Sequence, residues 1–290
     1  MQHLIEKAEV LIEALPYIQE FRDRTIIVKA GGSFMENADA LRGVLQDIVF
    51  MQCAGMRPVL VHGGGKAISA RLKAEKVETR FINGLRYTCD KTIRIVDDVL
   101  HNVINAELVR AIRELHGRPY SVSGKNVLRA ERYAERDENG NEVDLGFVGR
   151  VVNVDTEQLR WVTGRAEIPV ITPLGRDLNG VVYNINADMA ACTIAGQMKA
   201  HKLVFLSDVP GILRNPKDET SLISTIHCSE VEPLIVEGVV AGGMVPKLRS
   251  AVEALKAGCQ KVHLIDGRIA HSLLLEIFTD KGIGTQIVMD

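Results

Sequence analysis

The sequence has few cysteines, no long apolar run and almost no net charge. Its five cysteines are scattered, odd in number and without a C-x-x-C pair, which favours a reduced compartment and argues against a zinc site. No charged and then apolar leader opens the chain, and no run of about 18 apolar residues follows, which argues against secretion and membrane insertion. The net charge of −2 gives no electrostatic reason to expect a nucleic acid or an anionic membrane as partner. We therefore expect a cytoplasmic protein in which any anion-binding site is formed by a few neighbouring residues and not by the overall charge.

Two common phosphate-binding motifs are also missing. A Walker A loop requires G-x-x-x-x-G-K-[ST], but Leu60 stands at its first position and Ala67 at its last. The dinucleotide fingerprint G-x-G-x-x-G fits at Gly63 and Gly65, but Ile68 occupies the third glycine position. These departures exclude a P-loop and weaken a Rossmann interpretation.

The pattern of the chain predicts an α/β fold. With 290 residues, 46% of them hydrophobic and 25% charged, the chain can bury a large core as one domain or two lobes. Short β-branched runs alternate with amphipathic stretches, which predicts a mainly parallel sheet with helices on both faces and ligands at the carboxyl ends of the strands. We expect strands at 25–30, 58–61, 168–172, 202–206 and 261–265, one long helix from an N-cap at Asp90 to His116, and hairpins within 127–152 around E-N-G-N at 138–141.

The first 23 residues predict a separate helix. Its apolar stripe is interrupted by Pro16, which indicates a kink. The stripe covers either its own domain or a second subunit, and the pattern alone leaves both open. The stripe consists of Leu4, Ala8, Leu11, Leu15 and Ile18.

Four segments indicate phosphoryl transfer: two have a lysine beside paired glycines, and the other two lie between these along the chain. They are V-K-A-G-G at 28–32, H-G-G-G at 62–65, N-I-N-A-D at 184–188 and A-G-G-M-V-P-K at 241–247. Backbone N–H groups exposed by glycine can surround phosphate oxygens, and lysine adds a mobile positive charge. Taken singly, the triple glycine also fits a tight packing turn, and an isolated lysine fits a solvated surface.

Six segments in order resemble the N-acetylglutamate kinases, a branch of the amino acid kinase family. They are I-V-K-A-G-G, V-L-V-H-G-G-G, F-I-N-G-L-R-Y-T, V-Y-N-I-N-A-D, L-S-D-V-P-G-I-L and G-G-M-V-P-K, and they span nearly the whole chain. The resemblance implies an open αβα sandwich of the carbamate kinase-like type, with an oligomerising helix at 1–23, an acceptor lobe at 24–198 and a nucleotide lobe at 199–290. It also implies transfer of a phosphoryl group from ATP to the γ-carboxylate of N-acetyl-L-glutamate, an early step of arginine biosynthesis.

Lys29 and Lys247 match the two transition-state lysines of the resembled family. Such a pair suits this chemistry because the transition state spreads negative charge over oxygens at both the donor and the acceptor. Asp188 matches the carboxylate that orients them. A general base is not needed, because the acceptor carboxyl has a pKa of about 4.3 and is already ionised at neutral pH. A helix cap is the alternative role for Asp188.

The resemblance also assigns the binding residues. Arg86 is expected to clamp the α-carboxylate of the acceptor through its guanidinium fork, with Asn184 on the acetamido group and the backbone of Gly64 and Gly65 nearby. Magnesium is expected on the ATP phosphates with little direct protein ligation and no separate protein metal site. The expected nucleotide-binding residues are Gly31, Gly32, Ser207, Asp208 and Gly211.

Regulation by arginine is a further implication of the resemblance. An N-terminal helix that contains a tyrosine, here Tyr17, is typical of arginine-inhibited homohexamers built from interlaced helices. The C-terminal stretch resembles the effector region and places His271, Glu276, Gly282 and Gly284 near bound arginine.

Two departures from the resembled pattern leave the acceptor open. Lys66 replaces a common proline, and Asn126 and Val127 stand where relatives often have Asp-Gly. N-acetylaminoadipate, one methylene longer, is therefore an alternative acceptor, because one methylene is worth only about 1 to 3 kcal/mol of discrimination. A kinase acting on carbamate or a nucleoside monophosphate, and a non-catalytic arginine-sensing subunit, also stay open at this point.

Overall fold

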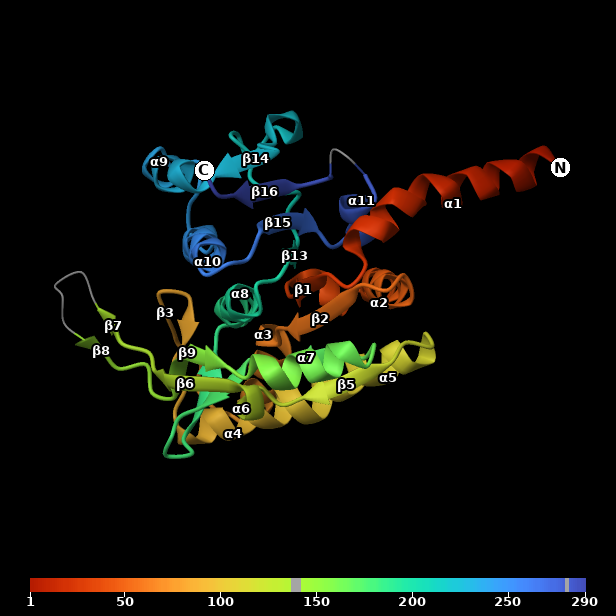
Figure 1. Cartoon of the computed structure of the whole chain (residues 1–290). Helices are drawn as coiled ribbons and strands as arrows, with labels where there is room; N and C mark the ends of the chain where they lie inside the picture. The colour runs from red at the N-terminus through yellow and green to blue at the C-terminus, as the bar shows by residue number, and fades with distance from the viewer. Residues whose placement is uncertain (137–141, 280–281) are drawn as a thin grey trace.

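A single eight-stranded sheet runs through the computed structural model, which describes residues 1–136, 142–279 and 282–290 (Figure 1). Its strand order is β14-β16-β15-β13-β1-β2-β10-β5; β15 and β16 pair antiparallel, and the other neighbours pair in parallel. The strands are β1 (Thr25–Ala30), β2 (Arg57–His62), β5 (Pro119–Val122), β10 (Ile168–Ile171), β13 (Lys202–Ser207), β14 (Thr225–His227), β15 (Lys261–Asp266) and β16 (Thr285–Val288).

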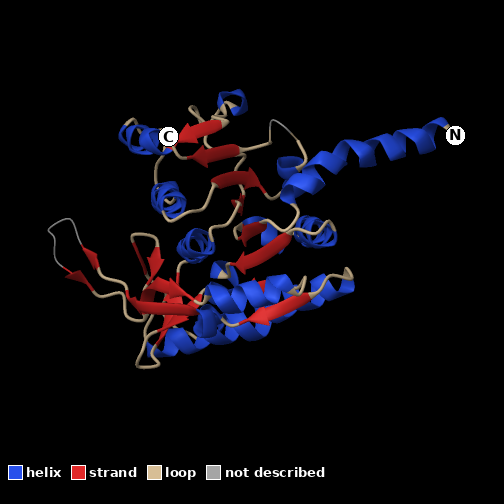
Figure 2. Ribbon diagram, in the orientation of Figure 1, coloured by secondary structure: helices blue, strands red, loops and turns tan. Residues whose placement is uncertain are grey.

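Helices cover both faces of this sheet, as Figure 2 shows. The described α-helices are α1 (Gln2–Phe21), α2 (Ala38–Cys53), α3 (Gly65–Ala74), α4 (Asp90–Asp98), α5 (Ala106–Glu114), α6 (Gly124–Val127), α7 (Thr156–Gly164), α8 (Ala187–Met198), α9 (Val231–Val236), α10 (Met244–Lys256) and α11 (Ser272–Ile277). Shorter or wider turns are η1 (Ser33–Glu36), η2 (Val99–Asn105), η3 (Glu219–Ser221) and η4 (Cys228–Glu230).

The buried strands divide their side chains between two cores. Ile27 of β1 belongs to the core that α8 and α10 cover, whereas Ile26 and Val28 belong to the core that α2, α5 and α11 cover. Successive side chains of a strand point to opposite faces, so a continuous apolar run can fill both cores. The mainly parallel α/β sandwich predicted from the sequence is confirmed.

A small barrel and two hairpins lie beside the main sheet. The barrel joins β11 (Leu174–Arg176), β12 (Val182–Ile185), β9 (Val148–Val154) and β6 (Leu128–Arg132). Two antiparallel pairs are β3 (Phe81–Ile82) with β4 (Leu85–Arg86), and β7 (Glu135–Arg136) with β8 (Glu142–Val143). The hairpins expected within 127–152 are thus present, and the expected turn at 138–141 lies outside the described residues.

The five predicted strands are confirmed within one residue at each end, but the long helix differs from its prediction in two respects. Cys89, and not Asp90, is the N-cap residue of α4. The run also passes through a π-helical segment, η2, before it continues as α5. Apolar spacing at three to five residues does not distinguish α from π geometry, so the sequence pattern could not reveal this segment.

Helix α1 is one 20-residue helix with Pro16 inside it, and most of it projects from the body (Figure 1). Phe21 is buried, and the ring of Tyr17 packs edge-on against Phe278 at 6.0 Å. Leu4 and Leu11 of the apolar stripe are 61% and 69% exposed. The end of the helix thus covers its own chain, while the first half of the stripe remains uncovered. Among the described helices, none is both long and apolar enough to cross a membrane.

The sheet order brings three loops to one edge. Strands β13, β1 and β2 are parallel neighbours, so their carboxyl ends lie side by side. Asp208 follows β13, Gly31 and Gly32 follow β1, and the triple glycine at 63–65 follows β2. The strands of 24–198 form one half of the sheet and those of 199–290 the other, so this edge spans the join between the two proposed lobes.

Candidate active site

Two adjoining cavities open at the carboxyl ends of the central strands. The first has a volume of about 240 Å³ and is lined by Lys29, the glycines at 63–65, Arg86, Asn184 and Asp188. The second, of about 800 Å³, also includes Asp188 and extends to Gly242, Gly243 and Lys247. Because they share lining residues, they form one cleft.

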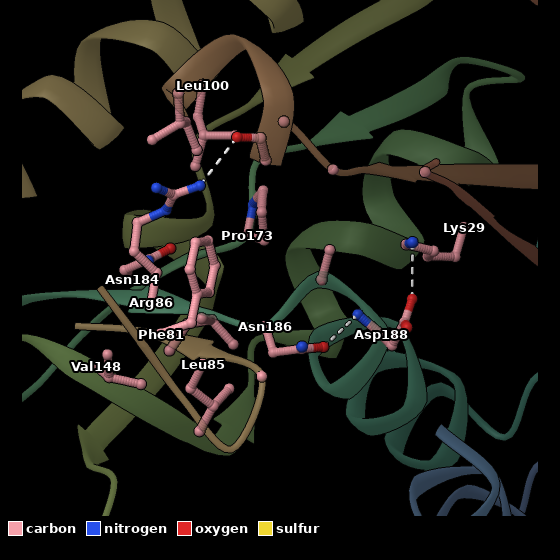
Figure 3. Close-up of a pocket in the computed structure, with 18 of the residues that line it drawn as sticks. Lys29, Phe81, Leu85, Arg86, Leu100, Val148, Pro173, Asn184, Asn186 and Asp188 are labelled. Carbon is pink, nitrogen blue, oxygen red and sulfur yellow. Dashed lines mark hydrogen bonds and ion pairs between the residues drawn. The ribbon is translucent and has the colours of Figure 1, made fainter. Parts of the chain in front are cut away.

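The two lysines meet on one carboxylate in this cleft. Lys29 Nζ lies 2.8 Å from Asp188 Oδ1, and Lys247 Nζ lies 3.2 Å from Asp188 Oδ2. Figure 3 shows Lys29 and Asp188 pointing toward each other. The side chains of both lysines are no more than 12% exposed. Residues far apart in the sequence therefore bring their ammonium groups to the same place, and neither lysine is a freely solvated surface residue.

Glycine at position 31 allows Lys29 to fold back into the cleft. Lys29 is the penultimate residue of β1, and a Cβ at Gly31 would lie 2.1 Å from its Nζ. Any side chain there would thus displace the ammonium group. The V-K-A-G-G pattern is explained by this close approach as well as by exposed backbone N–H groups.

Asp188 lies in the first turn of α8, but it is not the helix cap. Asn186 is the N-cap, and its side chain accepts hydrogen bonds from the backbone N–H groups of Asp188 and Met189 (Figure 3). Burial alone would raise the pKa of Asp188, but the charges of Lys29 and Lys247 outweigh it and lower that pKa from its usual value. The carboxylate is therefore ionised at neutral pH, with both oxygens engaged by lysines. The N-cap preference for asparagine was the signal that could have found Asn186.

Lys247 lies in the first turn of α10, which packs on the half of the sheet formed by residues 199–290, and its side chain lines the cleft. Its Nζ also lies 5.1 Å from the centroid of the Phe205 ring, on β13, which favours a cation. Gly242, with a φ of +56°, lets the chain turn into the helix.

Arg86 lies on the far side of the first cavity from Lys29 (Figure 3). Its Nη2 donates hydrogen bonds to the carbonyl of Gly65 at 2.9 Å and to Ser69 Oγ at 2.8 Å, and its guanidinium stacks on the ring of Phe81. Burial lowers the pKa of Arg86. Its Nη1 is buried, and no described residue accepts a hydrogen bond from it. A buried cationic donor without an acceptor is a position where a carboxylate ligand fits. Phe81 and Ser69 were not identified from the sequence.

Asn184, Gly64 and Gly65 line the same cavity as Arg86. The Nδ2 of Asn184 donates to Thr88 Oγ1 at 3.3 Å. Gly64 is the N-cap residue of α3, so backbone N–H groups of the first helical turn face the cleft. The structure thus brings the predicted catalytic and acceptor-binding residues into one cleft.

The residues predicted to bind the nucleotide are divided. Gly31 and Gly32 line the first cavity, whereas Ser207, Asp208 and Gly211 do not line either part of the cleft. Asp208 accepts a hydrogen bond from the backbone N–H of Phe34 at 3.0 Å and lies against Gly32. A Cβ at Gly211 would lie 2.5 Å from Thr285 Oγ1, so this glycine permits close packing. In this structure, Asp208 joins the loop after β13 to the loop after β1, and Gly211 packs against β16.

A separate cavity of about 480 Å³ lies between the end of α1 and the second half of the sheet. It includes Tyr17, Glu276, Gly282 and Gly284, four of the residues expected near arginine. His271 does not line it. Instead, His271 Nδ1 lies 2.6 Å from Asp47 Oδ1 of α2. The reason is the left-handed backbone of His271 at the start of α11, which turns this residue toward α2 and not toward β15.

Glu276 is the buried carboxylate of the cavity at the end of α1. His263 Nδ1 lies 2.6 Å from Glu276 Oε1, and the backbone N–H of Ile283 donates to Oε2 at 3.0 Å. Burial lowers the pKa of His263, which favours the neutral ring. Burial would raise the pKa of Glu276, but the hydrogen bond from His263 and the other contacts lower it. Lys202 and Lys261 also line this cavity, as does Glu20.

Residues 24–266 match the model of the amino acid kinase family, and the chain belongs to that family. Two similar proteins are both acetylglutamate kinases. The one from Akkermansia muciniphila is 44% identical over 288 residues, which are 99% of this chain and 97% of the relative. The one from Caldanaerobacter subterraneus is 47% identical over 285 residues, which are 98% of this chain and 93% of the relative.

Solved structures share the fold. An N-acetylglutamate synthase from Neisseria gonorrhoeae, complexed with coenzyme A and N-acetyl-glutamate, superposes with a TM-score of 0.84 at 26% identity. The match covers 97% of this chain but 63% of the synthase chain, so this chain spans less than two thirds of that protein. The same synthase was also solved with L-arginine, with a TM-score of 0.80. A Giardia carbamate kinase, at 16% identity and a TM-score of 0.67, shares the fold alone.

Proposed function

We infer that this chain is an acetylglutamate kinase, which transfers a phosphoryl group from ATP to N-acetyl-L-glutamate in arginine biosynthesis. Family membership and near full-length similarity to acetylglutamate kinases support the reaction. The observation that carries the chemistry is the meeting of Lys29 and Lys247 on Asp188. In the reaction, a γ-carboxylate oxygen of the acceptor forms a bond to the γ-phosphorus, and the bond from that phosphorus to the β,γ-bridging oxygen breaks, with ADP leaving.

The two lysines are the proposed transition-state cations. Lys29 comes from the half of the sheet that carries the acceptor cavity, and Lys247 from the other half, so together they can contact oxygens on both sides of the transferred group. The proposed role of Asp188 is to aim them, because each of its oxygens forms an ion pair with one of the lysines. A proton-abstracting role does not fit this carboxylate, since its pKa is lowered and the acceptor is already ionised.

The acceptor is proposed to lie between Arg86 and Lys29. Its α-carboxylate would take the unpaired Nη1 of Arg86, and Asn184 would contact the acetamido group. This orientation leaves the γ-carboxylate facing Lys29 and the backbone of Gly64 and Gly65. A carboxylate at each end of the ligand thus meets a separate cation.

ATP is proposed to bind in the wider part of the cleft, against Gly242, Gly243 and the start of α10. Among the described residues, no group of three or more His, Cys, Asp or Glu side chains is arranged to hold a metal ion. Asp188, the carboxylate in the cleft, is engaged by lysines. Magnesium therefore fits best as an ion carried on the phosphates, where it offsets their charge. Gly31, Gly32, Ser207, Asp208 and Gly211 remain proposed nucleotide residues.

Feedback inhibition by arginine is the regulatory part of this proposal. The cavity with Tyr17 and Glu276 offers carboxylates for a guanidinium and lysines for a carboxylate, as an amino acid requires. A homohexamer joined through α1 and a cytoplasmic location remain predictions. Removing residues 1–20 should break the hexamer and abolish arginine inhibition while kinase activity persists, which sedimentation and activity assays can check. A truncated dimer still inhibited by arginine would contradict the proposal.

ADP release by the full chain tests the proposed function. With MgATP we expect ADP to form only when N-acetyl-L-glutamate is added, together with an equal amount of acyl phosphate trapped by hydroxylamine. N-acetylaminoadipate, carbamate and a nucleoside monophosphate are the parallel acceptors. Faster turnover with one of these three would reassign the substrate. A folded chain that binds arginine but releases no ADP with any acceptor would be a sensing subunit.

A further inference from the structure

The helical run from Asp90 to Glu114 changes geometry in its middle, beside the cleft. Between α4 and α5, the seven residues of η2 form a π-helix. Residues five apart are joined by backbone hydrogen bonds in a π-helix and lie on the same side of it, whereas in an α-helix they are separated by roughly 140° around the axis. Leu100 and Asn105 are five apart. The π geometry therefore places both on the side that faces the strands.

Two apolar side chains of η2 fill the space beside Gly64. A Cβ at Gly64 would lie 2.7 Å from Leu100 Cδ2 and 2.6 Å from Ile104 Cδ1, distances that are too short for carbon contacts. Leu100 also lines the acceptor cavity, where Figure 3 shows it near Arg86. Position 64 is thus a glycine because η2 packs directly on the loop, and any side chain there would have to displace Leu100 or Ile104.

Asn105, the last residue of η2, is fully buried and makes three polar contacts. Its Nδ2 donates to the carbonyl of Val170 at 2.8 Å and lies 3.2 Å from His62 Nε2. Its Oδ1 accepts a hydrogen bond from Ser121 Oγ at 2.6 Å. One side chain thus joins η2 to the ends of β2, β5 and β10.

These contacts determine the protonation of His62. Because Asn105 Nδ2 is a donor, His62 Nε2 must be the acceptor, so the ring proton lies on Nδ1. Nδ1 then donates to the carbonyl of Gly63 at 3.0 Å. Burial lowers the pKa of His62 to about 4, so the ring stays neutral at neutral pH. Both nitrogens are occupied, and His62 has no free nitrogen with which to move a proton.

The triple glycine is therefore held from three directions. His62 holds Gly63, η2 packs on Gly64, and Arg86 donates to the carbonyl of Gly65. In addition, the backbone N–H of Gly63 donates to the carbonyl of Ala30 at 2.8 Å. Glycine backbones have wide conformational freedom, so such a loop presents its N–H groups in one direction only if its surroundings hold it.

We propose that the π-helical segment η2 positions the acceptor-binding glycine loop, with Asn105 and His62 as positioning residues and Leu100 limiting the space beside Gly64. This inference depends on the proposed function, in which Gly64 and Gly65 contact the acceptor. Neither Asn105 nor His62 touches the reacting atoms. Their effect is on the direction of the loop N–H groups.

The first test replaces Asn105 by leucine, which has a similar size but no polar group. The acceptor KM should rise about tenfold or more, because a small misplacement of positioning groups has effects of this size or larger. The KM for ATP should change by less than about twofold, since the loop contacts the acceptor. Ser121→Ala is the matched control. It removes a contact of the same asparagine but leaves the bond to His62, so the acceptor KM should stay within about threefold of the starting value.

A pair of substitutions at His62 separates positioning from packing. In His62→Asn, the amide nitrogen can replace Nδ1 and keep the bond to Gly63, whereas in His62→Gln the amide can meet Asn105 but loses Gly63. We expect the acceptor KM of His62→Gln to exceed that of His62→Asn by about fivefold or more. Thermal unfolding midpoints of both variants report any general loss of stability.

The outcomes separate this inference from the proposed function. If the unsubstituted chain releases no ADP with N-acetyl-L-glutamate, the proposed function fails and this inference fails with it. If it does release ADP, but Asn105→Leu keeps its acceptor KM or raises the KM for ATP equally, the positioning role is wrong and the proposed function stands. Should Asn105→Leu not fold, the His62 pair decides: equal acceptor KM values for the two variants overturn the inference.

Discussion

The catalytic cleft and the cavity at the end of α1 each contain a buried carboxylate, but the charges around the two carboxylates differ. Asp188 is contacted by two lysine ammonium groups, at 2.8 and 3.2 Å. Glu276 is contacted by His263, a ring that burial keeps neutral. The same group, an ionised carboxylate, therefore lies in an environment with excess positive charge in one cavity and in a nearly balanced environment in the other.

This difference predicts the kind of ligand that each cavity takes. Among the described residues that line the cleft, Lys29, Lys247, Arg86 and Arg249 stand against the single carboxylate of Asp188, and Arg249 also pairs with Glu232 outside it. This excess of positive charge suits a triphosphate and an anionic acceptor. The other cavity combines two carboxylates, Glu20 and Glu276, with two ammonium groups, Lys202 and Lys261, which suits a ligand with charges of both signs. A buried carboxylate by itself does not define a site; the cations placed around it do.

The largest expected effect comes from removing a cation of the catalytic cleft. Lys29→Ala or Lys247→Ala should lower the turnover rate by roughly 10² or more, because each removes one oriented donor to the transition state. Lys256→Ala is the control, since Lys256 is an exposed lysine of the same helix, α10, as Lys247. Steady-state assays of the folded variants measure this. Near-normal turnover in either cleft variant would show that the meeting of the lysines on Asp188 is structural.

The next effect concerns the acceptor end of the cleft. Arg86→Lys should raise the acceptor KM by about tenfold or more with a smaller change in turnover, since one ammonium group cannot hold Gly65 and Ser69 and also present the donor that Nη1 offers to the carboxylate. Arg71→Lys, on the exposed side of α3, is the control because its guanidinium pairs with Glu75 outside the cavity. The two KM values are compared under saturating ATP. An unchanged acceptor KM in Arg86→Lys would mean that the α-carboxylate binds elsewhere.

A smaller effect, on inhibition by arginine, is expected in the cavity at the end of α1. Glu276→Gln removes the buried charge without changing size, so the arginine concentration for half-inhibition should rise about tenfold, the value of one charge-assisted hydrogen bond. Glu253→Gln, an exposed carboxylate on α10, is the control. Inhibition curves for both variants give the result. Superimposable curves for Glu276→Gln and the unsubstituted chain would remove the proposed effector role of this cavity.

The smallest expected effect concerns the buried histidine beside the glycine loop, His62. It is measured as a change in the free energy of unfolding with pH. The pKa of His62 is about 4 in the fold, against 6.5 for an unperturbed histidine, so the unfolded state binds more protons between these values. The free energy of unfolding should therefore fall by about 2 kcal/mol from this residue when the pH is lowered from about 8 to about 5. Urea unfolding at both pH values measures it. His62→Asn should lose that part of the pH dependence, and an identical dependence in the variant would mean that His62 is not held neutral.

Much of the fold could be predicted from local pattern. The five strand predictions were confirmed because buried parallel strands are short, continuous apolar runs bounded by glycine or polar residues. The π segment was missed because its residues have the same apolar spacing as an α-helix. The sequence left two roles open for Asp188, orienting the lysines or capping α8. In the structure the N-cap of α8 is Asn186, whose side chain accepts hydrogen bonds from two backbone N–H groups.

The candidate site was predictable in its residues but less so in their contacts. Motif similarity indicated Lys29, Asp188 and Lys247, and parallel strands place such loops at one edge. The stacking of Arg86 on Phe81 and the packing of η2 on Gly64 depend on side chains from separate elements. His271 was expected near bound arginine because the C-terminal stretch resembles an effector region, but its ring lies beside Asp47 and does not line the cavity at the end of α1.

The sequence by itself determined the alternation of strands and helices, the glycine loops at strand ends and the residue types needed for phosphoryl transfer. These are local properties, set by side-chain spacing and backbone freedom. Only the tertiary structure decided that two ammonium groups share one carboxylate, that a neutral histidine holds the glycine loop, and which carboxylate lies among balanced charges. These depend on distances across the fold and on burial, because removing a group from water changes both its charge state and the strength of every contact that it makes.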